Sequence, residues 1–221
     1  MAKNTSSSIS KEKIYDAYWD YLLEEGERPK SVYKFCKHLS IQEGDFFSYF
    51  NSFDIIEASF WEKCVEETIN TLNEDDEYEN YPVRQKILAY CYTFFAHAIN
   101  HRSKFLIAFP KLPCDLKYLI KSPTSLDRFS KTFSSWIDER IAEAIQKDEI
   151  KDRKGINNIY PELLVWVHWY FIDYNLKDNS EKFEATDELI EKVVNLFFDL
   201  VRSQVFDSGL DLVKFLIRNK A

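Results

Sequence analysis

Apolar residues recur at helical spacing along most of the chain. Side chains three, four and seven positions apart form apolar stripes, which is the pattern of helices that bury one face. The chain has only four glycines and six prolines in 221 residues, and so few turn signals favour long helices over many short strands. The pattern predicts an all-α protein of nine or ten helices, over residues 11–25, 31–39, 44–50, 52–73, 83–100, 126–147, 161–172, 186–208 and 210–218, with short pieces in 102–122.

The segment 30–56 predicts two short helices joined by a tight turn, followed by the start of a longer helix. The second short helix begins at Gly44, and Ser52 stands at the N-cap position of the longer one. Two helices joined in this way form a helix-turn-helix unit, whose second helix fits the major groove of DNA. We expect three phenylalanines of the second helix to pack back on the first: Phe46, Phe47 and Phe50.

An acidic and polar stretch at 73–82 ends in proline and is the best candidate for a domain boundary. We therefore expect a helix-turn-helix domain at 1–51, a connecting helix and acidic linker at 52–81, and a larger helical domain at 82–221.

The net charge of −8 argues against a basic coat over the whole protein, although a local basic patch is compatible with it. No run of about 18 apolar residues occurs, and residues 1–10 contain no apolar signal core, so we expect no transmembrane segment. The four cysteines form no close pair and suit a reducing compartment, which predicts a cytoplasmic protein: Cys36, Cys64, Cys91 and Cys114.

The first 60 or so residues resemble the TetR family of bacterial transcription regulators. The resemblance is carried by a glycine after the first helix, a Ser-Val start to the second, a short turn, a further glycine and an aromatic-rich helix before a capping serine. It implies a homodimer that binds a DNA operator, with a C-terminal domain that holds a hydrophobic ligand and the dimer interface. The matching residues are Gly26, Ser31, Val32, Ser40, Ile41, Gly44, the segment 46–50, Asn51 and Ser52.

The chain departs from this family where DNA would be touched. Glu43 and Asp45 replace small, basic or hydroxyl residues, while Phe47 and Phe53 replace a tyrosine and a lysine that commonly meet phosphate. Carboxylates repel phosphate, and phenylalanine cannot donate a hydrogen bond.

Residues 1–57 also hold seven basic and ten acidic side chains, a net charge of −3. A small positive edge from Arg28 and the nearby lysines would still allow DNA binding, whereas the alternative is an inherited scaffold that no longer binds DNA. The candidate DNA-binding residues are Lys30, Ser31, Lys34, Gln42, Asp45 and Tyr49.

The stretch 169–220 has a weaker similarity to the TetR-fold lipid-binding proteins of ubiquinone biosynthesis. The shared pattern is a Trp-Tyr helix with an aspartate, a charged loop, a long helix and a final amphipathic helix. This resemblance implies a lipid or isoprenoid ligand, a last helix that acts at membranes, and no DNA contact.

The aromatic residues of the larger domain predict an apolar cavity between bundle helices, although the same rings would also simply fill a core. His97, His101 and His168 are possible metal ligands, but no nearby acid completes such a site, so we predict neither a metal nor a cofactor. No nucleophile or phosphate-loop motif is present, so we expect no enzyme. The candidate ligand-binding residues are Tyr90, Phe94, His97, Phe105, Trp136, Trp166, His168 and Trp169.

The apolar stripe of 186–208 is wider than a single contact needs. Together with the helix at 163–172, which is apolar on nearly every side, it predicts a four-helix dimer interface built from two copies. The alternative is that both helices are covered within one subunit.

Overall fold

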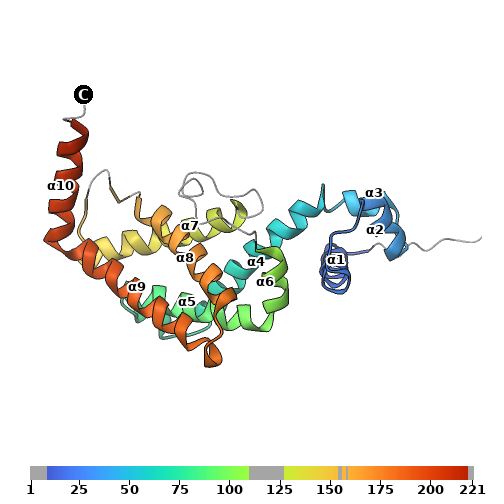
Figure 1. The fold of residues 1–221 in the computed structure, drawn as a ribbon, viewed down its shortest axis with the longest axis horizontal. Coiled ribbons are helices and arrows are strands. Elements are labelled where there is room, and N and C mark those ends of the chain that lie inside the picture. Colours follow the sequence, from blue (N-terminus) through green and yellow to red (C-terminus); the bar gives the residue numbers. More distant parts are fainter. Residues whose placement is uncertain (1–8, 110–126, 154–155, 158, 219–221) are drawn as a thin grey trace, which may run out of the picture. The chain divides into compact units, whose positions relative to one another are not determined.

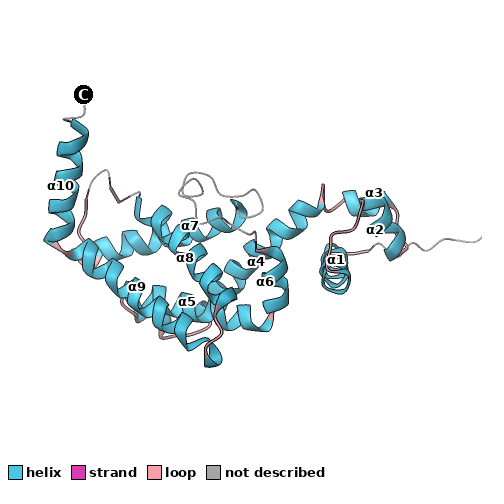
Figure 2. Ribbon diagram, in the orientation of Figure 1, coloured by secondary structure: helices cyan, strands magenta, loops and turns pink. Residues whose placement is uncertain are grey.

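The computed structural model describes residues 9–109, 127–153, 156–157 and 159–218, and the regular structure in these segments is entirely helical (Figures 1 and 2). This confirms the all-α prediction. The α-helices of the described chain are α1 (Lys11–Glu25), α2 (Val32–Leu39), α3 (Glu43–Phe47), α4 (Phe53–Asn73), α5 (Val83–Asn100), α6 (Arg102–Ala108), α7 (Asp127–Gln146), α8 (Ile159–Lys177), α9 (Glu184–Arg202) and α10 (Gln204–Arg218).

Two short 3-10 helices, η1 (Tyr78–Asn80) and η4 (Glu181–Phe183), precede α5 and α9. The helical pieces predicted beyond residue 109 and the fourth cysteine, Cys114, lie outside the described residues. Within the described chain, no helix combines the length and the apolar character needed to cross a membrane.

Packing divides the chain into two compact units. The first comprises Met1–Cys64 and Asn100–Phe129, and the second comprises Val65–Ile99 and Ser130–Ala221, so α4 contributes to both. The two units are groups of residues that contact one another more than they contact the rest of the chain. The domain boundaries expected from the sequence stay predictions.

Local signals set the helix ends in the first unit. The Ser10 hydroxyl accepts a hydrogen bond from the Lys13 N–H at 3.2 Å, and Gly26 ends α1 with a φ of +70°. A left-handed residue is the usual stop for a helix, and glycine adopts that conformation at the least steric cost. Ser31 caps α2 in the same way as Ser10 caps α1, by accepting from the Lys34 N–H at 3.2 Å.

Polar side chains distant in sequence set the helix ends in the second unit. The Glu149 carboxylate accepts hydrogen bonds from the Val83 and Arg84 N–H groups at 2.9 and 3.3 Å, so an anion lies at the N-terminus of α5. Asp178 accepts from the N–H and hydroxyl of both Ser180 and Thr186, which fixes the turn between α8 and α9.

The break between the last two helices lies at Ser203, and the sequence prediction that placed it near Gly209 is wrong. Arg153, which is buried, donates hydrogen bonds to the carbonyls of Val201 and Ser203, and its guanidinium also pairs with Asp207 at 2.5 Å. The Ser203 hydroxyl then accepts from the Phe206 N–H at 3.3 Å, as an N-cap of α10. The break is therefore set by a side chain about 50 residues away in the sequence.

Candidate functional site

The helix-turn-helix of the first unit is built on a cluster of aromatic rings. Phe35 of α2 lies edge-on to Phe46 of α3 and to Phe53 of α4, with ring centroids 6.2 and 5.6 Å apart. Phe53 also stacks on Tyr18 of α1 at 5.1 Å. The residue that replaces a phosphate-binding lysine of the family therefore packs among the rings that join the helices.

The second helix of the motif is short and ends at Phe47, so Phe50 lies beyond it. The sequence prediction also misplaced one of the three phenylalanines expected to pack on α2. Phe46 and Phe50 are buried, but 50% of Phe47 is exposed, so the expectation that Phe47 packs against α2 is wrong. The physical reason is spacing, because residues 46 and 50 lie one turn apart on the buried side and residue 47 is turned away from it. The helix α3 ends at Phe47, and the turn after it keeps two bonds of helical spacing, from the Ser48 N–H to the Gly44 carbonyl at 3.0 Å and from the Phe50 N–H to the Phe46 carbonyl at 2.9 Å.

A positive edge lies on the outside of α2 and its approach. Lys30, Lys34 and Lys37 are exposed, and no ion pair joins them to other described residues. Ser31, Gln42 and Tyr49 are exposed as well. The lysine, Gln42 and Tyr49 side chains are therefore accessible to an anionic surface, and the Ser31 hydroxyl also caps α2.

The acidic residues of the motif have a local role. The Asp45 carboxylate accepts a hydrogen bond from the Gln42 N–H at 3.0 Å, which is half of a capping box at the start of α3. Asp45 is half-buried and Glu43 is exposed. The structure therefore gives Asp45 a capping contact, and its predicted place in a DNA interface stays a prediction.

Arg28, which we counted in the positive edge, is held by carboxylates. Its guanidinium donates to Glu57 at 2.7 and 2.5 Å and pairs with Asp54 at 2.9 Å. The Tyr18 hydroxyl donates to the same Glu57 carboxylate at 2.5 Å. The hydrogen bonds that Arg28 donates to Glu57 raise the pKa of Arg28. Burial, and after it the hydrogen bond donated to Glu57, raises the pKa of Tyr18. The cluster ties α1, the approach to α2 and α4 together.

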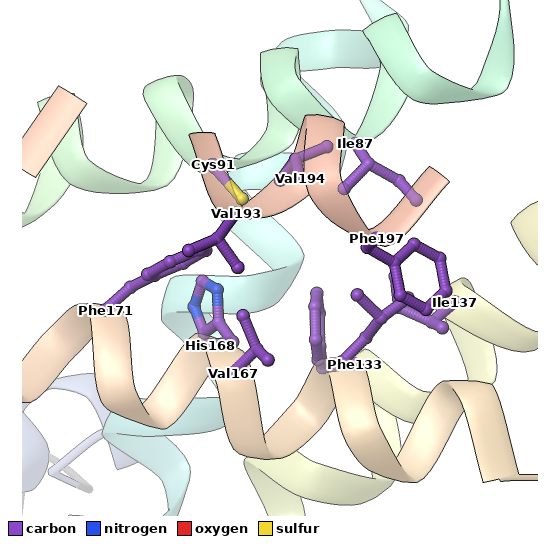
Figure 3. Close-up of a pocket in the computed structure, with 11 residues that line it drawn as sticks. Ile87, Cys91, Phe133, Ile137, Val167, His168, Phe171, Val193, Val194 and Phe197 are labelled. Carbon is purple, nitrogen blue, oxygen red and sulfur yellow. The ribbon is translucent and has the colours of Figure 1, made fainter. Parts of the chain in front are cut away.

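A small apolar cavity lies among α5, α7, α8 and α9 in the second unit (Figure 3). Its volume is about 20 Å³, which is room for roughly one water molecule. In Figure 3 the ring of His168 projects from α8 into the space between Phe171, Val193 and Phe133. The lining side chains are Ile87, Cys91, Phe133, Ile137, Leu164, Val167, His168, Phe171, Val193, Val194 and Phe197.

His168 is enclosed by aromatic rings. Its ring centroid lies 4.5 Å from that of Phe94, 4.8 Å from Phe133 and 5.5 Å from Tyr90. Burial lowers the pKa of the His168 imidazole from 6.5 to about 3, so the ring is neutral at physiological pH. A neutral imidazole offers one hydrogen-bond donor and one acceptor.

The structure brings together part of the predicted ligand-binding set. His168 lines the cavity, and the rings of Tyr90 and Phe94 pack against the His168 ring. Trp136 packs on Tyr90, with ring centroids 4.5 Å apart. Trp169 is buried but does not line the cavity.

Three other members of the set lie elsewhere. Phe105 belongs to the first unit, where it packs on Phe60 and Trp61 at 5.1 Å from each. Trp166 is on the outer side of α8, and His97 is half-buried on α5 outside the cavity wall. Within the described residues, no group of three or more His, Cys, Asp or Glu side chains is arranged to hold a metal ion.

Most lining residues that the sequence reasoning missed are aliphatic, and they come from the buried stripes of four helices. Leu164, Val194 and Ile137 have the spacing and burial of ordinary core residues. No sequence signal separates a residue that lines a small cavity from one that fills a core.

A second feature of this unit is an apolar outer face on α8 and α9. On α8 four exposed apolar residues follow the spacing i, i+4, i+7, i+11. On α9 four apolar residues, two of them exposed and two half-buried, follow the same spacing. The two helices contact each other. On α8 the stripe is Ile159, Leu163, Trp166 and Tyr170, and on α9 it is Leu189, Val193, Leu196 and Leu200.

Comparison with known proteins agrees with this architecture. A family model described as the tetracyclin repressor-like C-terminal domain matches residues 86–216, which is more than half of the chain. A search of curated proteins found no match. The matched segment includes α7, α8 and α9 and most of α5, the helices that enclose the cavity and carry the apolar outer face. The chain belongs to the TetR family.

Proposed function

We propose that this protein is a ligand-responsive transcription regulator, which binds an operator through α2 and α3 and a hydrophobic molecule in the cavity of its second unit. The observation that carries the proposal is the positive edge formed by Lys30, Lys34 and Lys37 beside the second helix of the motif. Lysines of this kind neutralise phosphates and supply most of the affinity of a DNA-binding protein. In this role the protein acts in the cytoplasm.

The remaining candidate residues fit the same surface. The Ser31 hydroxyl caps α2 and lies beside the lysines, and Gln42 and Tyr49 are exposed at either end of α3. Gln42 suits a base edge, since an amide pairs well with adenine, and Tyr49 suits a phosphate or sugar. Two carboxylates, Glu43 and Asp45, lie near this surface. One of them, Asp45, accepts the capping hydrogen bond from the Gln42 N–H.

The apolar outer face of α8 and α9 supports a homodimer. Leu196 is 57% exposed and Leu200 is 41% exposed in the single chain. Large apolar side chains in a continuous stripe are costly to leave in water, and a second copy of the same two helices would cover them as a four-helix bundle. A twofold symmetric protein then places two motifs on two operator half-sites.

Fluorescence anisotropy with the DNA upstream of the protein's own gene tests the proposal directly. We expect binding in about 50 mM salt that weakens steeply by about 200 mM salt, because each phosphate contact releases counterions. Absence of salt-sensitive binding at micromolar protein concentration would contradict DNA recognition.

A TetR-fold lipid-binding protein without DNA contact is the second candidate, and specific observations favour it. Phe53 is packed in the aromatic cluster, Phe47 offers no hydrogen-bond donor, and Arg28 is committed to Glu57. Native mass spectrometry of freshly purified protein separates the candidates. A co-purified lipid together with no DNA binding supports this second function.

A further inference from the structure

The side of α3 that is turned away from the buried Phe46 presents four exposed residues. Residues four positions apart lie on one face of a helix, so Glu43 shares a face with Phe47, and Gly44 shares it with Ser48. The helix α3 packs on α2, and it is the helix of the motif that fits a major groove (Figure 1). We call these four residues the outer face of α3.

Two side chains of the outer face are available to a partner. The Ser48 hydroxyl is engaged locally, because it donates to the Gly44 carbonyl at 2.7 Å. The Glu43 carboxylate makes no hydrogen bond or ion pair with another described residue. The Phe47 ring meets the Phe46 ring edge-on at 5.4 Å, and half of Phe47 stays exposed.

Gly44 is a choice that the fold itself does not require. It lies inside α3, and a Cβ added at this position would meet nothing within 4 Å. Apart from proline, glycine is the least favourable residue in a helix, so alanine would fit here and favour the helix. A glycine in such a place lets another molecule approach the backbone closely.

The residues that fail to match phosphate match the edges of pyrimidines. A carboxylate accepts a hydrogen bond from the amino group that cytosine presents in the major groove, and a phenylalanine packs on the methyl group of thymine. The segment 30–50 also holds three lysines against two carboxylates, a net charge of +1 with histidine neutral. Glu43 therefore leaves the motif attractive to DNA.

Four helical residues advance by about 6 Å and successive base pairs by about 3.4 Å, so Glu43 and Phe47 reach bases one or two steps apart. We infer that the outer face of α3 reads a cytosine and a thymine at this spacing in each operator half-site. Glu43 accepts from the cytosine amino group, Phe47 packs on the thymine methyl group, and Gly44 lets the groove come close. The inference rests on the proposed function, since it names bases of the operator.

Replacing thymine by deoxyuridine tests the Phe47 contact, because the two bases differ only by the methyl group. Binding sites are first selected from random-sequence DNA with the wild-type full-length protein. Fluorescence anisotropy then compares each selected site with versions that carry uracil at single thymine positions. We expect uracil at the contacted position to weaken binding by roughly fourfold, the effect of one lost methyl contact.

Variants assign the two base contacts to their residues. Phe47→Ala should bind the thymine and uracil sites equally, whereas Tyr33→Ala, which removes an exposed ring from α2, should keep the difference. Glu43→Ala should relax the preference for cytosine by about fivefold or more. The uracil comparison on the wild type needs no variant, so the test does not depend on how the variants fold.

Matched glycine variants test the close approach. Gly44→Ala should weaken DNA binding by about tenfold or more, while the midpoint of thermal unfolding stays unchanged or rises by up to about 3 °C. Gly209→Ala is the control, because Gly209 lies in α10 and also has nothing within 4 Å of an added Cβ. This second variant should bind DNA as the wild type does.

Three results would overturn the inference: equal binding of thymine and uracil at every position, a thymine preference that survives in Phe47→Ala, or full DNA affinity in Gly44→Ala. A cytosine preference that is unchanged in Glu43→Ala would overturn the Glu43 contact. Salt-sensitive DNA binding together with any of these results contradicts only the readout by α3. A wild type that binds no DNA contradicts the proposed function and this inference together.

Discussion

At the scale of single residues, His168 links the stability of the second unit to pH. Its pKa is lowered from 6.5 to about 3, so between these values the unfolded chain takes up a proton that the folded chain does not. Above about pH 6.5 this residue therefore causes no loss in the free energy of unfolding. As the pH falls below that value, the free energy of unfolding declines by up to about 1.4 kcal/mol per pH unit.

We predict that His168→Phe flattens this dependence. Urea unfolding between about pH 7 and pH 5 measures it, since the free energy of unfolding should fall less in the variant than in the wild type. The other histidines are present in both proteins, so the difference reports on residue 168. Identical slopes would show that His168 takes up a proton as readily in the folded protein as in the unfolded chain.

Asp178 adds a second pH dependence in the same direction, at lower pH. Burial alone raises the pKa of this carboxyl, but the hydrogen bonds from Ser180 and Thr186 outweigh it and lower the pKa to about 2. The stability that Asp178 provides is thus present above about pH 4 and is lost as the pH falls towards 2.

We predict that Asp178→Ala lowers the free energy of unfolding at pH 7 by about 1 to 2 kcal/mol, the usual cost of losing a capping side chain. Asp173→Ala is the control, because Asp173 forms only an exposed pair with Lys177 at 2.6 Å and its loss should cost under about 0.5 kcal/mol. Equal losses of stability in the two variants would show that the hydrogen bonds of Asp178 in the turn between α8 and α9 do not stabilise the fold more than a surface ion pair does.

At the scale of the elements, the Glu57 carboxylate joins three parts of the first unit. It receives hydrogen bonds from Tyr18 of α1 and from Arg28 ahead of α2, and it belongs to α4. We predict that Glu57→Ala destabilises the protein by about 3 kcal/mol, because a buried hydroxyl loses its acceptor and Arg28 loses its principal partner.

Arg128→Ala serves as the comparison for Glu57→Ala. Arg128 pairs with Glu62 at 3.0 Å on the exposed side of α4, and such a pair contributes less than about 1 kcal/mol. Chemical denaturation of both variants measures the difference. A loss below about 1 kcal/mol for Glu57→Ala would mean that the three elements are held by the aromatic cluster alone.

Elements set by local signals were predictable from the sequence, and those set by distant contacts were not. Ser10, Ser31 and Gly26 mark helix ends through bonds to their own neighbours, so α1 and α2 were placed correctly. The break at Ser203 has a local signal, the serine cap of α10, but it also depends on the distant Arg153, which the sequence does not connect with it.

The same contrast holds for the candidate site. The sequence singles out His168 as a histidine in an apolar helix, and its ligand contact stays a prediction, whereas its aliphatic neighbours Val194 and Ile137 look like any core residue. Phe105 lies in the first unit, because a sequence does not reveal in which of two units an aromatic ring is buried, and its place in a ligand site stays a prediction.

At the scale of the whole molecule, the outer face of α8 and α9 predicts the oligomeric state. Leu196→Glu with Leu200→Glu places two charges in the proposed interface, and we expect this variant to sediment as a monomer. The wild type should sediment at about twice the chain mass of 26.3 kDa. Glu188→Ala, on the polar side of α9, should leave the dimer intact. A wild-type monomer at micromolar concentration would contradict the interface.

The most direct test of DNA recognition by this TetR-family protein is the salt dependence of binding in matched lysine variants. The slope of log K against log salt should fall by about 1 for each phosphate contact removed, so Lys34→Ala should lower it while weakening binding to all sequences. Lys13→Ala makes the same change of charge on exposed α1 and should leave the slope unchanged. Equal slopes for the wild type and both variants, or no binding by the wild type, would contradict DNA recognition by α2 and α3.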